Sequence, residues 1–285
     1  MSPGVRESHV MTEPAMHVTA IEAATGTTAT GTATTGTAAI EAAAIEAALR
    51  AAGTPERAAS EKAYLKSDLE FAGTPVPVLR ATVRSWCAGR PELARADVVA
   101  VARALWSRPV HDCRMASVEL LDARTGLLRA EDALLVEAML RTARTWALVD
   151  SLAGHVMGKL AERYPELART LDRWAADDDF WIRRSALLAL LGPLRRGDGD
   201  FARFGRYADS MLEEKEFFIR KAIGWVLRDT ARRRPALVAE WLAPRVHRAS
   251  GVTMREAVKP LPPDIREQLM AGYRDKRPVT LPGRG

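Results

Sequence analysis

The sequence has few of the features that mark metal enzymes, nucleotide-binding enzymes or disulfide-bonded proteins. Its 285 residues include only two cysteines, Cys87 and Cys113, which form no CxxC pair, and five dispersed histidines. This composition argues against a disulfide framework and against a zinc site. Neither GxGxxG nor GxxxxGK[ST] occurs, so the commonest phosphate-binding loops are missing too. The sequence therefore predicts neither a metal nor a cofactor.

Long apolar runs are also missing. No run reaches the roughly 18 apolar residues that a spanning helix needs, and the N-terminus lacks the charged-then-apolar pattern of a secretory signal. We therefore expect a cytoplasmic protein with no membrane partner.

Basic residues are abundant and unevenly distributed. The chain has 42 Lys and Arg against 36 Asp and Glu, but residues 1–60 contain three Arg and six Glu, so the remainder carries a net charge of +9. A charge excess of this kind says little about the fold, but it indicates a polyanionic partner, nucleic acid before a membrane surface.

The sequence pattern beyond residue 38 is helical. Apolar residues recur at i, i+3, i+4 and i+7, as in residues 98–106 and 133–152, and alternating β-type stretches are nearly missing. By contrast, residues 17–37 consist almost entirely of Thr, Ala and Gly and cannot supply a core. We predict a disordered tail over residues 1–37, a folded all-α domain over 38–265 and a flexible end over 266–285.

Segments of this domain repeat with a period near 36 residues. The motif RPELA at 90–94 returns as YPELA at 164–168 and as RPALV at 234–238, with spacings of 74 and 70 residues, or about two periods each. In addition, WIRRSA at 181–186 is followed 37 residues later by FIRKA at 218–222. Two-helix units of this length are typical of an α-solenoid, slightly shorter than the HEAT norm of about 40 to 47 residues. We expect a curved HEAT-like stack with a concave, basic groove.

Four residues occupy equivalent places in these repeats. Trp146 and Asp150 are four residues apart and share one helix face, and Arg184 and Trp225 lie near the same register in later units. Indole rings attract cations, and a carboxylate stabilises developing positive charge, so the group suits a cationic substrate. The plainer alternatives are a core role for each Trp, and for Asp150 a helix cap or an ion pair with Arg144 or Arg184.

One long motif resembles a known family. Residues 216–228, EFFIRKAIGWVLR, resemble the KEFFIxKAIGWVLR signature of the DNA alkylation repair family, the AlkD-like HEAT-repeat alkylpurine DNA glycosylases. Shorter blocks agree in order: AYLK (63–66) and FAGT (71–74), LW (105–106), TW (145–146) through VDS (149–151), WIRR (181–184) and REAVK (255–259). The resemblance covers roughly residues 40–262.

The resemblance implies an enzyme of base excision repair. Such an enzyme hydrolyses the N-glycosidic bond of cationic N3- or N7-alkylated purines in duplex DNA without enclosing the base in a deep pocket. By motif, Asp150 would be the catalytic carboxylate, Trp146 and Trp225 the aromatic walls, and Arg184 a cleft arginine that holds the DNA backbone. The sequence departs from the family at Ala147, where an acidic residue often follows the first cleft Trp.

The expected partner is duplex DNA containing alkylated purines, bound by a monomer that needs no protein partner and associates with the nucleoid. We assign the DNA contacts to Tyr64, Arg183, Arg220, Lys221, Arg255 and Lys259. One alternative is a non-catalytic HEAT protein that binds distorted or branched DNA. A protein-interaction solenoid is the other, although a protein partner does not require the charge of +9.

Overall fold

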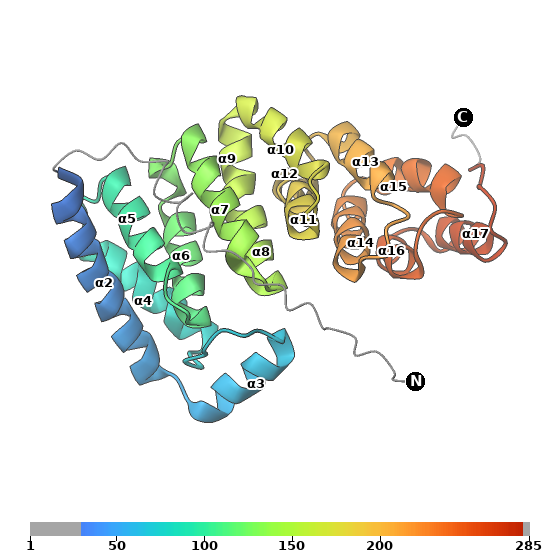
Figure 1. The fold of residues 1–285 in the computed structure, drawn as a ribbon. Helices are drawn as coiled ribbons and strands as arrows, with labels where there is room; N and C mark the ends of the chain where they lie inside the picture. The colour runs from blue at the N-terminus through green and yellow to red at the C-terminus, as the bar shows by residue number, and fades with distance from the viewer. Residues whose placement is uncertain (1–29, 282–285) are drawn as a thin grey trace, which may run out of the picture.

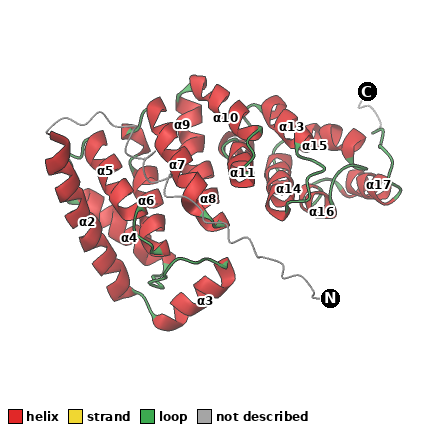
Figure 2. Cartoon of the chain, viewed as in Figure 1, coloured by secondary structure: helices red, strands yellow, loops and turns green. Residues whose placement is uncertain are grey.

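The chain forms an arc of short helices, and the computed structural model describes residues 30–281 (Figure 1). Within that range Figure 2 shows helices and loops and no strand. The helices are α2 (Thr30–Ala52), α3 (Pro55–Leu65), α4 (Val76–Ala88), α5 (Arg95–Trp106), α6 (His111–Ala123), α7 (Ala133–Ala143), α8 (Trp146–Ser151), α9 (Gly158–Arg163), α10 (Ala168–Ala175), α11 (Phe180–Leu188), α12 (Leu191–Arg196), α13 (Phe201–Ser210), α14 (Phe217–Ala231), α15 (Pro235–Leu242), α16 (Gly251–Ala257) and α17 (Pro263–Arg274). A π-helical segment, η3 (Leu152–Met157), joins α8 to α9, and short 3-10 turns lie at Thr125–Leu127, Ala130–Asp132, Pro165–Leu167 and Ala243–Arg245.

Side-chain hydrogen bonds between successive units reproduce the repeat. The indole of Trp106 donates to Thr142, 36 residues on, and the indole of Trp174 donates to Glu137, 37 residues back. Tyr207 donates to Asp172 across an interval of 35 residues. Each bond joins one helix to its counterpart in the next unit, so the sequence period corresponds to one step of the stack. The all-helical repeat fold expected from the sequence is confirmed.

The core is a continuous apolar seam between the helices. Helix α2, for example, buries Ala38, Ala42, Ile45 and Leu49 against α4, α5 and α6. Its apolar residues follow a helical spacing, so a single stripe covers the partner helices.

Both predicted domain boundaries are displaced in the structure. Helix α2 begins at Thr30, so residues 30–37 continue a helix that the Thr/Ala/Gly composition had assigned to the tail; residues 1–29 lie outside the described part. At the other end, the segment predicted to be flexible from residue 266 contains most of α17. Leu269 is fully buried, and the backbone amide of Val279 donates to the carbonyl of Ala243 at 2.9 Å. Many charged residues in this segment had concealed its one apolar stripe.

Candidate functional site

The turn between α7 and α8 sets the positions of Trp146 and Asp150 on the second of these helices. Arg144 adopts the left-handed conformation with φ of 54°, which reverses the chain after α7. Thr145 then caps α8, because its hydroxyl accepts the amide of Ala147 at 3.2 Å. Helix α8 therefore starts at Trp146, and Asp150 lies one turn further along the same face.

Asp150 forms a bidentate ion pair with Arg184 of the next unit. Nε of Arg184 donates to Oδ1 of Asp150 at 2.7 Å, and Nη2 donates to Oδ2 at 2.8 Å. The third arm, Nη1, donates to the carbonyl of Phe218. The Arg184 side chain is only 3% exposed and that of Asp150 14%.

This geometry places Arg184 inside the protein. Its side chain is buried and three of its five N–H donors meet protein oxygens, which favours a role in orienting Asp150 over the expected contact with the DNA backbone. Of the two ion-pair partners considered from the sequence, the structure selects Arg184 and not Arg144. A carboxylate has about four lone-pair sites, and Arg184 uses two, so the exposed side of Asp150 keeps acceptor capacity.

Tyr64 lies edge-on to Trp146 although 82 residues separate them. Their ring centroids are 5.8 Å apart with an interplanar angle of 88°, and Tyr64 is 71% exposed. Tyr64 belongs to α3, a helix with no buried residue that extends below the rest of the arc in Figure 1. The structure thus brings an exposed aromatic ring, Tyr64, against the half-buried ring of Trp146.

Two glycines hold α3 in this position. A Cβ on Gly53 would lie 1.9 Å from the carbonyl oxygen of Ala72. Gly73 has φ of +73°, and a Cβ there would lie 2.4 Å from the carbonyl oxygen of Thr54. Only glycine permits this close backbone approach.

Trp225 is partly buried on α14 and is held by a carboxylate. Its indole donates to Oδ2 of Asp229 at 3.2 Å, and Asp229 is 6% exposed. No hydrogen bond or ring contact within residues 30–281 links Trp225 to Asp150 or Trp146. In the structure Asp150 therefore contacts Arg184 and Trp146 contacts Tyr64, whereas Trp225 contacts neither pair and is bonded to Asp229.

An aromatic cluster lies beside the ion pair and was missed by the analysis of the sequence. Trp181 packs against Phe180 and Phe218 with centroid distances of 4.5 and 4.8 Å, and Phe217, 54% exposed, packs edge-on to Phe218 at 5.5 Å. Phe218 also lies under the Arg184 guanidinium, 5.8 Å from its carbon. The paired phenylalanines in the motif of residues 216–228 were the available signal.

Most of the predicted DNA-binding cations are engaged within the protein. Nη2 of Arg183 pairs with Glu214 at 2.8 Å, and Arg220 donates to the Glu214 carbonyl at 2.6 Å. Lys221 and Lys259 both pair with Glu256, at 2.9 and 3.0 Å.

The shared carboxylate, Glu256, is buried. Burial opposes its ionisation, but hydrogen bonds from Lys221 and Lys259 outweigh burial and lower the pKa of Glu256 to about 2. Arg255 differs from these residues, because it is exposed and forms no ion pair within residues 30–281. DNA contact through all six residues remains a prediction.

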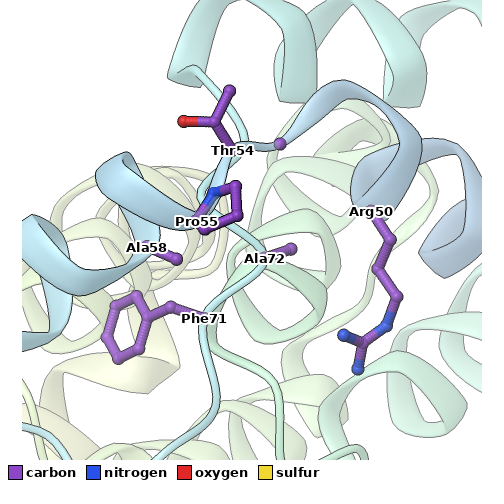
Figure 3. A pocket seen from close by; sticks show the side chains of 7 residues that line it. Arg50, Thr54, Pro55, Ala58, Phe71 and Ala72 are labelled. Carbon is purple, nitrogen blue, oxygen red and sulfur yellow. The ribbon is translucent and has the colours of Figure 1, made fainter.

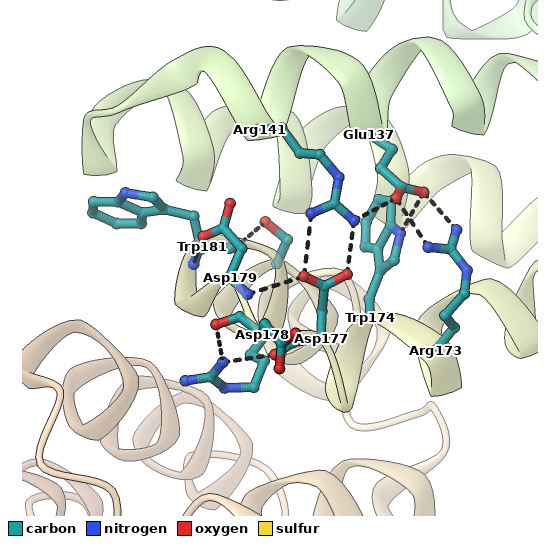
Figure 4. A network of polar contacts seen from close by, with 10 residues as sticks. Glu137, Arg141, Arg173, Trp174, Asp177, Asp178, Asp179 and Trp181 are labelled. Atoms are coloured by element: carbon teal, nitrogen blue, oxygen red, sulfur yellow. Dashed lines mark hydrogen bonds and ion pairs between the residues drawn. The ribbon is translucent and has the colours of Figure 1, made fainter. Parts of the chain in front are cut away.

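A second network anchors the start of α11, which carries Arg184 (Figure 4). Glu137 accepts the Trp174 indole at 2.9 Å as well as Arg141 and Arg173, and Arg141 also binds Asp177 at 2.7 Å. Burial opposes ionisation of Glu137, but these hydrogen bonds dominate and lower its pKa to about 2. The network ties α7 to the turn that precedes α11.

That turn leads directly into the cap of α11. Asp177 accepts the amide of Asp179 at 3.0 Å, and Asp179 in turn accepts the amide of Trp181 at 2.8 Å. A chain of hydrogen bonds therefore connects Glu137 to the helix that presents Arg184 to Asp150.

A hollow in the described part lies away from these residues. It is found at the α2–α3 corner and is lined by Arg50, Gly53, Thr54, Pro55, Ala58, Phe71 and Ala72 (Figure 3). Its one charged group, Arg50, is already paired with Glu46 and Glu70. None of the predicted site residues lines this hollow.

Residues 30–281 lack two kinds of feature. They contain no group of three or more His, Cys, Asp or Glu side chains arranged to hold a metal ion. Their helices include none with the length and apolarity needed to cross a membrane.

Comparison with known proteins gives a family and a fold. Residues 45–261 match the family described as DNA alkylation repair enzyme. A solved structure from Enterococcus faecalis, described as a predicted DNA alkylation repair enzyme, has a TM-score of 0.66 and 23% identity, and the match covers 73% of this chain and 95% of that one. AlkD2 from Streptococcus mutans has a TM-score of 0.52 and 16% identity, over 71% of this chain and 98% of that one. Comparison with curated proteins gave no match. At such identities the structural likeness shows the fold alone.

Proposed function

Because the chain belongs to the DNA alkylation repair enzyme family, we propose that it is an alkylpurine DNA glycosylase. Its reaction is the hydrolysis of the N-glycosidic bond of cationic N3- or N7-alkylated purines in duplex DNA. The observation that carries this proposal is the carboxylate of Asp150, which Arg184 holds in one orientation on the same helix face as Trp146.

The chemistry needs little besides charge stabilisation. An alkylated purine already carries a positive charge, so it leaves as a neutral base without help from a strong general acid. The bond between C1′ and the purine nitrogen breaks, and the sugar becomes an oxocarbenium ion that the Asp150 carboxylate stabilises. Water then attacks C1′ while its oxygen is positioned by Asp150, and the released proton passes to solvent.

The aromatic residues bind the nucleotide around this carboxylate. The rings of Trp146 and Tyr64 lie together, and their faces can attract the cationic purine and pack against the deoxyribose. Trp225 contributes from α14 with its ring held by Asp229. An open arrangement of this kind suits a lesion that is not flipped into a closed pocket.

The protein binds DNA as a monomer, through exposed cationic side chains. Arg255 is the best placed of the predicted contacts, because it is exposed and forms no ion pair within the described residues. Contacts of this type bind phosphates without reading sequence, and the binding weakens as salt increases.

The direct test is release of free base from duplex DNA treated with a methylating agent. We expect wild-type protein to release 7-methylguanine or 3-methyladenine and Asp150→Asn to release it about 10²- to 10³-fold more slowly, as when one charge-stabilising group is lost. Asp178→Asn is the matched control, because Asp178 is exposed and its carboxylate has no partner among residues 30–281. Wild-type release by Asp150→Asn would refute the assignment.

A second candidate is a non-catalytic protein that binds distorted or branched DNA. It is favoured by the ion pair itself, because a carboxylate matched to a buried arginine also has a purely structural explanation. This alternative predicts salt-sensitive DNA binding with no base release from wild type or from Asp150→Asn.

A further inference from the structure

Five arginines gather where two neighbouring helices end. Helix α12 finishes with two of them, and the other three follow directly after α14. We call this group the arginine edge; its members are Arg195, Arg196, Arg232, Arg233 and Arg234.

Contacts within the protein place these residues side by side. Nη2 of Arg195 pairs with Asp229 at 2.7 Å, and Nε of Arg232 approaches the same carboxylate at 3.9 Å. Arg233 lies over Gly197, the residue after α12, where an added Cβ would be 3.4 Å from the Cβ of Arg233. Arg234 donates to the carbonyl of Asp198 at 2.6 Å.

The cations of the edge outnumber the nearby carboxylates. Two carboxylates form ion pairs with it, Asp229 and Glu162, the latter through Arg196. Even when Asp198, which forms no ion pair with another described residue, is counted as a third carboxylate, two of the five positive charges remain in excess. Four of the five residues are exposed to solvent, with side-chain exposures of 51% for Arg195, 56% for Arg196 and 65% for Arg232; Arg234 is half-buried.

Helix electrostatics explain only part of this excess. Each helix C-terminus carries about half a negative charge, so two helix ends account for about one of the five cations. Clustered like charges also repel one another in the folded state. An external anion would relieve that repulsion.

The edge is remote from the Asp150–Arg184 pair. Arg184 contacts the carbonyl of Phe218 at the start of α14, whereas Arg232 follows the end of that helix. At 1.5 Å per residue, these two positions on α14 are about 21 Å apart. The edge therefore cannot touch a nucleotide held at Asp150.

We propose that the arginine edge is a second DNA contact, which binds phosphates of the duplex outside the lesion. This inference rests on the proposed function for its partner. Duplex DNA carries one negative charge per about 1.7 Å of axis, so a duplex held at Asp150 offers phosphates at this distance. Guanidinium groups suit them, because each can form paired hydrogen bonds to phosphate oxygens.

The test compares two double variants that lose the same net charge. Arg232→Gln with Arg233→Gln removes two cations of the edge, and Arg84→Gln with Arg266→Gln removes two exposed arginines that form no ion pair in the described part. Binding to a fluorescent duplex would be measured by anisotropy across a range of salt concentrations. We expect the edge variant to bind about tenfold more weakly and the slope of log K against log[salt] to fall by about two, with wild-type behaviour in the control.

Either an unchanged slope in the edge variant or an equal loss in the control would overturn the proposal. If Arg232→Gln disturbs Asp229 and the protein does not fold, Arg196→Gln with Arg233→Gln tests the same surface, since the Arg196–Glu162 pair is exposed.

Single-turnover base release at saturating enzyme separates this proposal from the proposed function. Base release by wild type together with an unchanged slope in the variant refutes the edge alone. Absence of base release together with a reduced slope refutes the glycosylase and leaves the edge.

Discussion

The Asp150–Arg184 pair yields the most stringent prediction. Both side chains are largely buried, and Arg184 donates to both carboxylate oxygens and to a carbonyl. Replacing Arg184 by Met leaves a buried carboxylate and a carbonyl without their donor. Loss of one partner from a buried pair costs about 3–5 kcal/mol in the free energy of unfolding.

A double-mutant cycle isolates the interaction. Asp150→Ala, Arg184→Met and the double variant would be unfolded with urea, and the free energies of unfolding extrapolated to water. Once either partner is gone, removal of the other costs little, so we expect a coupling energy of about 2 kcal/mol or more. The control cycle uses the i,i+4 pair Arg57–Glu61 on α3, whose side chains are 42% and 25% exposed and for which about 0.3–0.5 kcal/mol is expected. Single effects that add within about 0.5 kcal/mol at Asp150 and Arg184 would refute the reasoning.

The same pair separates orientation from phosphate binding. Arg184→Lys keeps the positive charge but cannot form the bidentate contact. We expect single-turnover base release to fall by tenfold or more while the Kd for DNA stays unchanged. If instead the Kd rises and the single-turnover rate is preserved, Arg184 holds the DNA backbone, and its assignment as an orienting residue is wrong.

Four other residues give independent predictions. Glu137→Gln should destabilise the protein at neutral pH by about 3 kcal/mol, because the folded-state pKa of Glu137 is about 2 and its ordinary value is 4.5. The stability that Glu137 contributes should be present above pH 4.5 and be lost as the pH falls toward 2. Urea melts that show the same effect at every pH would contradict this prediction. Burial lowers the pKa of His111 from 6.5 to about 4. Between these pH values the unfolded chain binds more protons than the folded protein, so the free energy of unfolding should fall as the pH drops from 6.5 to 4. His111→Phe should flatten this part of the plot of unfolding free energy against pH, and an unaltered plot would refute the assignment. Tyr64→Ala should change the free energy of unfolding by about 1 kcal/mol or less, because the ring is 71% exposed, yet it should weaken binding of lesion-containing DNA; equal loss of stability and binding would contradict this. Gly73→Ala should displace α3 because of the contact at 2.4 Å, so limited proteolysis should cut α3 faster than in wild type; an unchanged digestion rate would show that the corner can adapt.

The helical repeat could be predicted because it depends on short-range regularities. Apolar spacing along a helix reports the buried face, and the return of motifs near 36 residues reports the stacked unit. Trp146 and Asp150 share a face through the geometry of a single helix turn, so their proximity also follows from the sequence. The domain ends were predicted less well, since composition alone did not reveal the helix from Thr30 or the buried Leu269.

The partners across the stack had to come from the tertiary structure. Which arginine meets Asp150, and whether Lys221 is open to DNA or tied to Glu256, depends on how one unit lies on the next, over intervals of 34 and 35 residues. A one-residue shift along a helix turns a side chain by about 100°, enough to move it from solvent into a contact. Sequence periodicity measures the step between units only to within a few residues. The sequence by itself therefore determined the fold and the helix face that carries the carboxylate, and packing between units decided that Arg184 is buried beneath it.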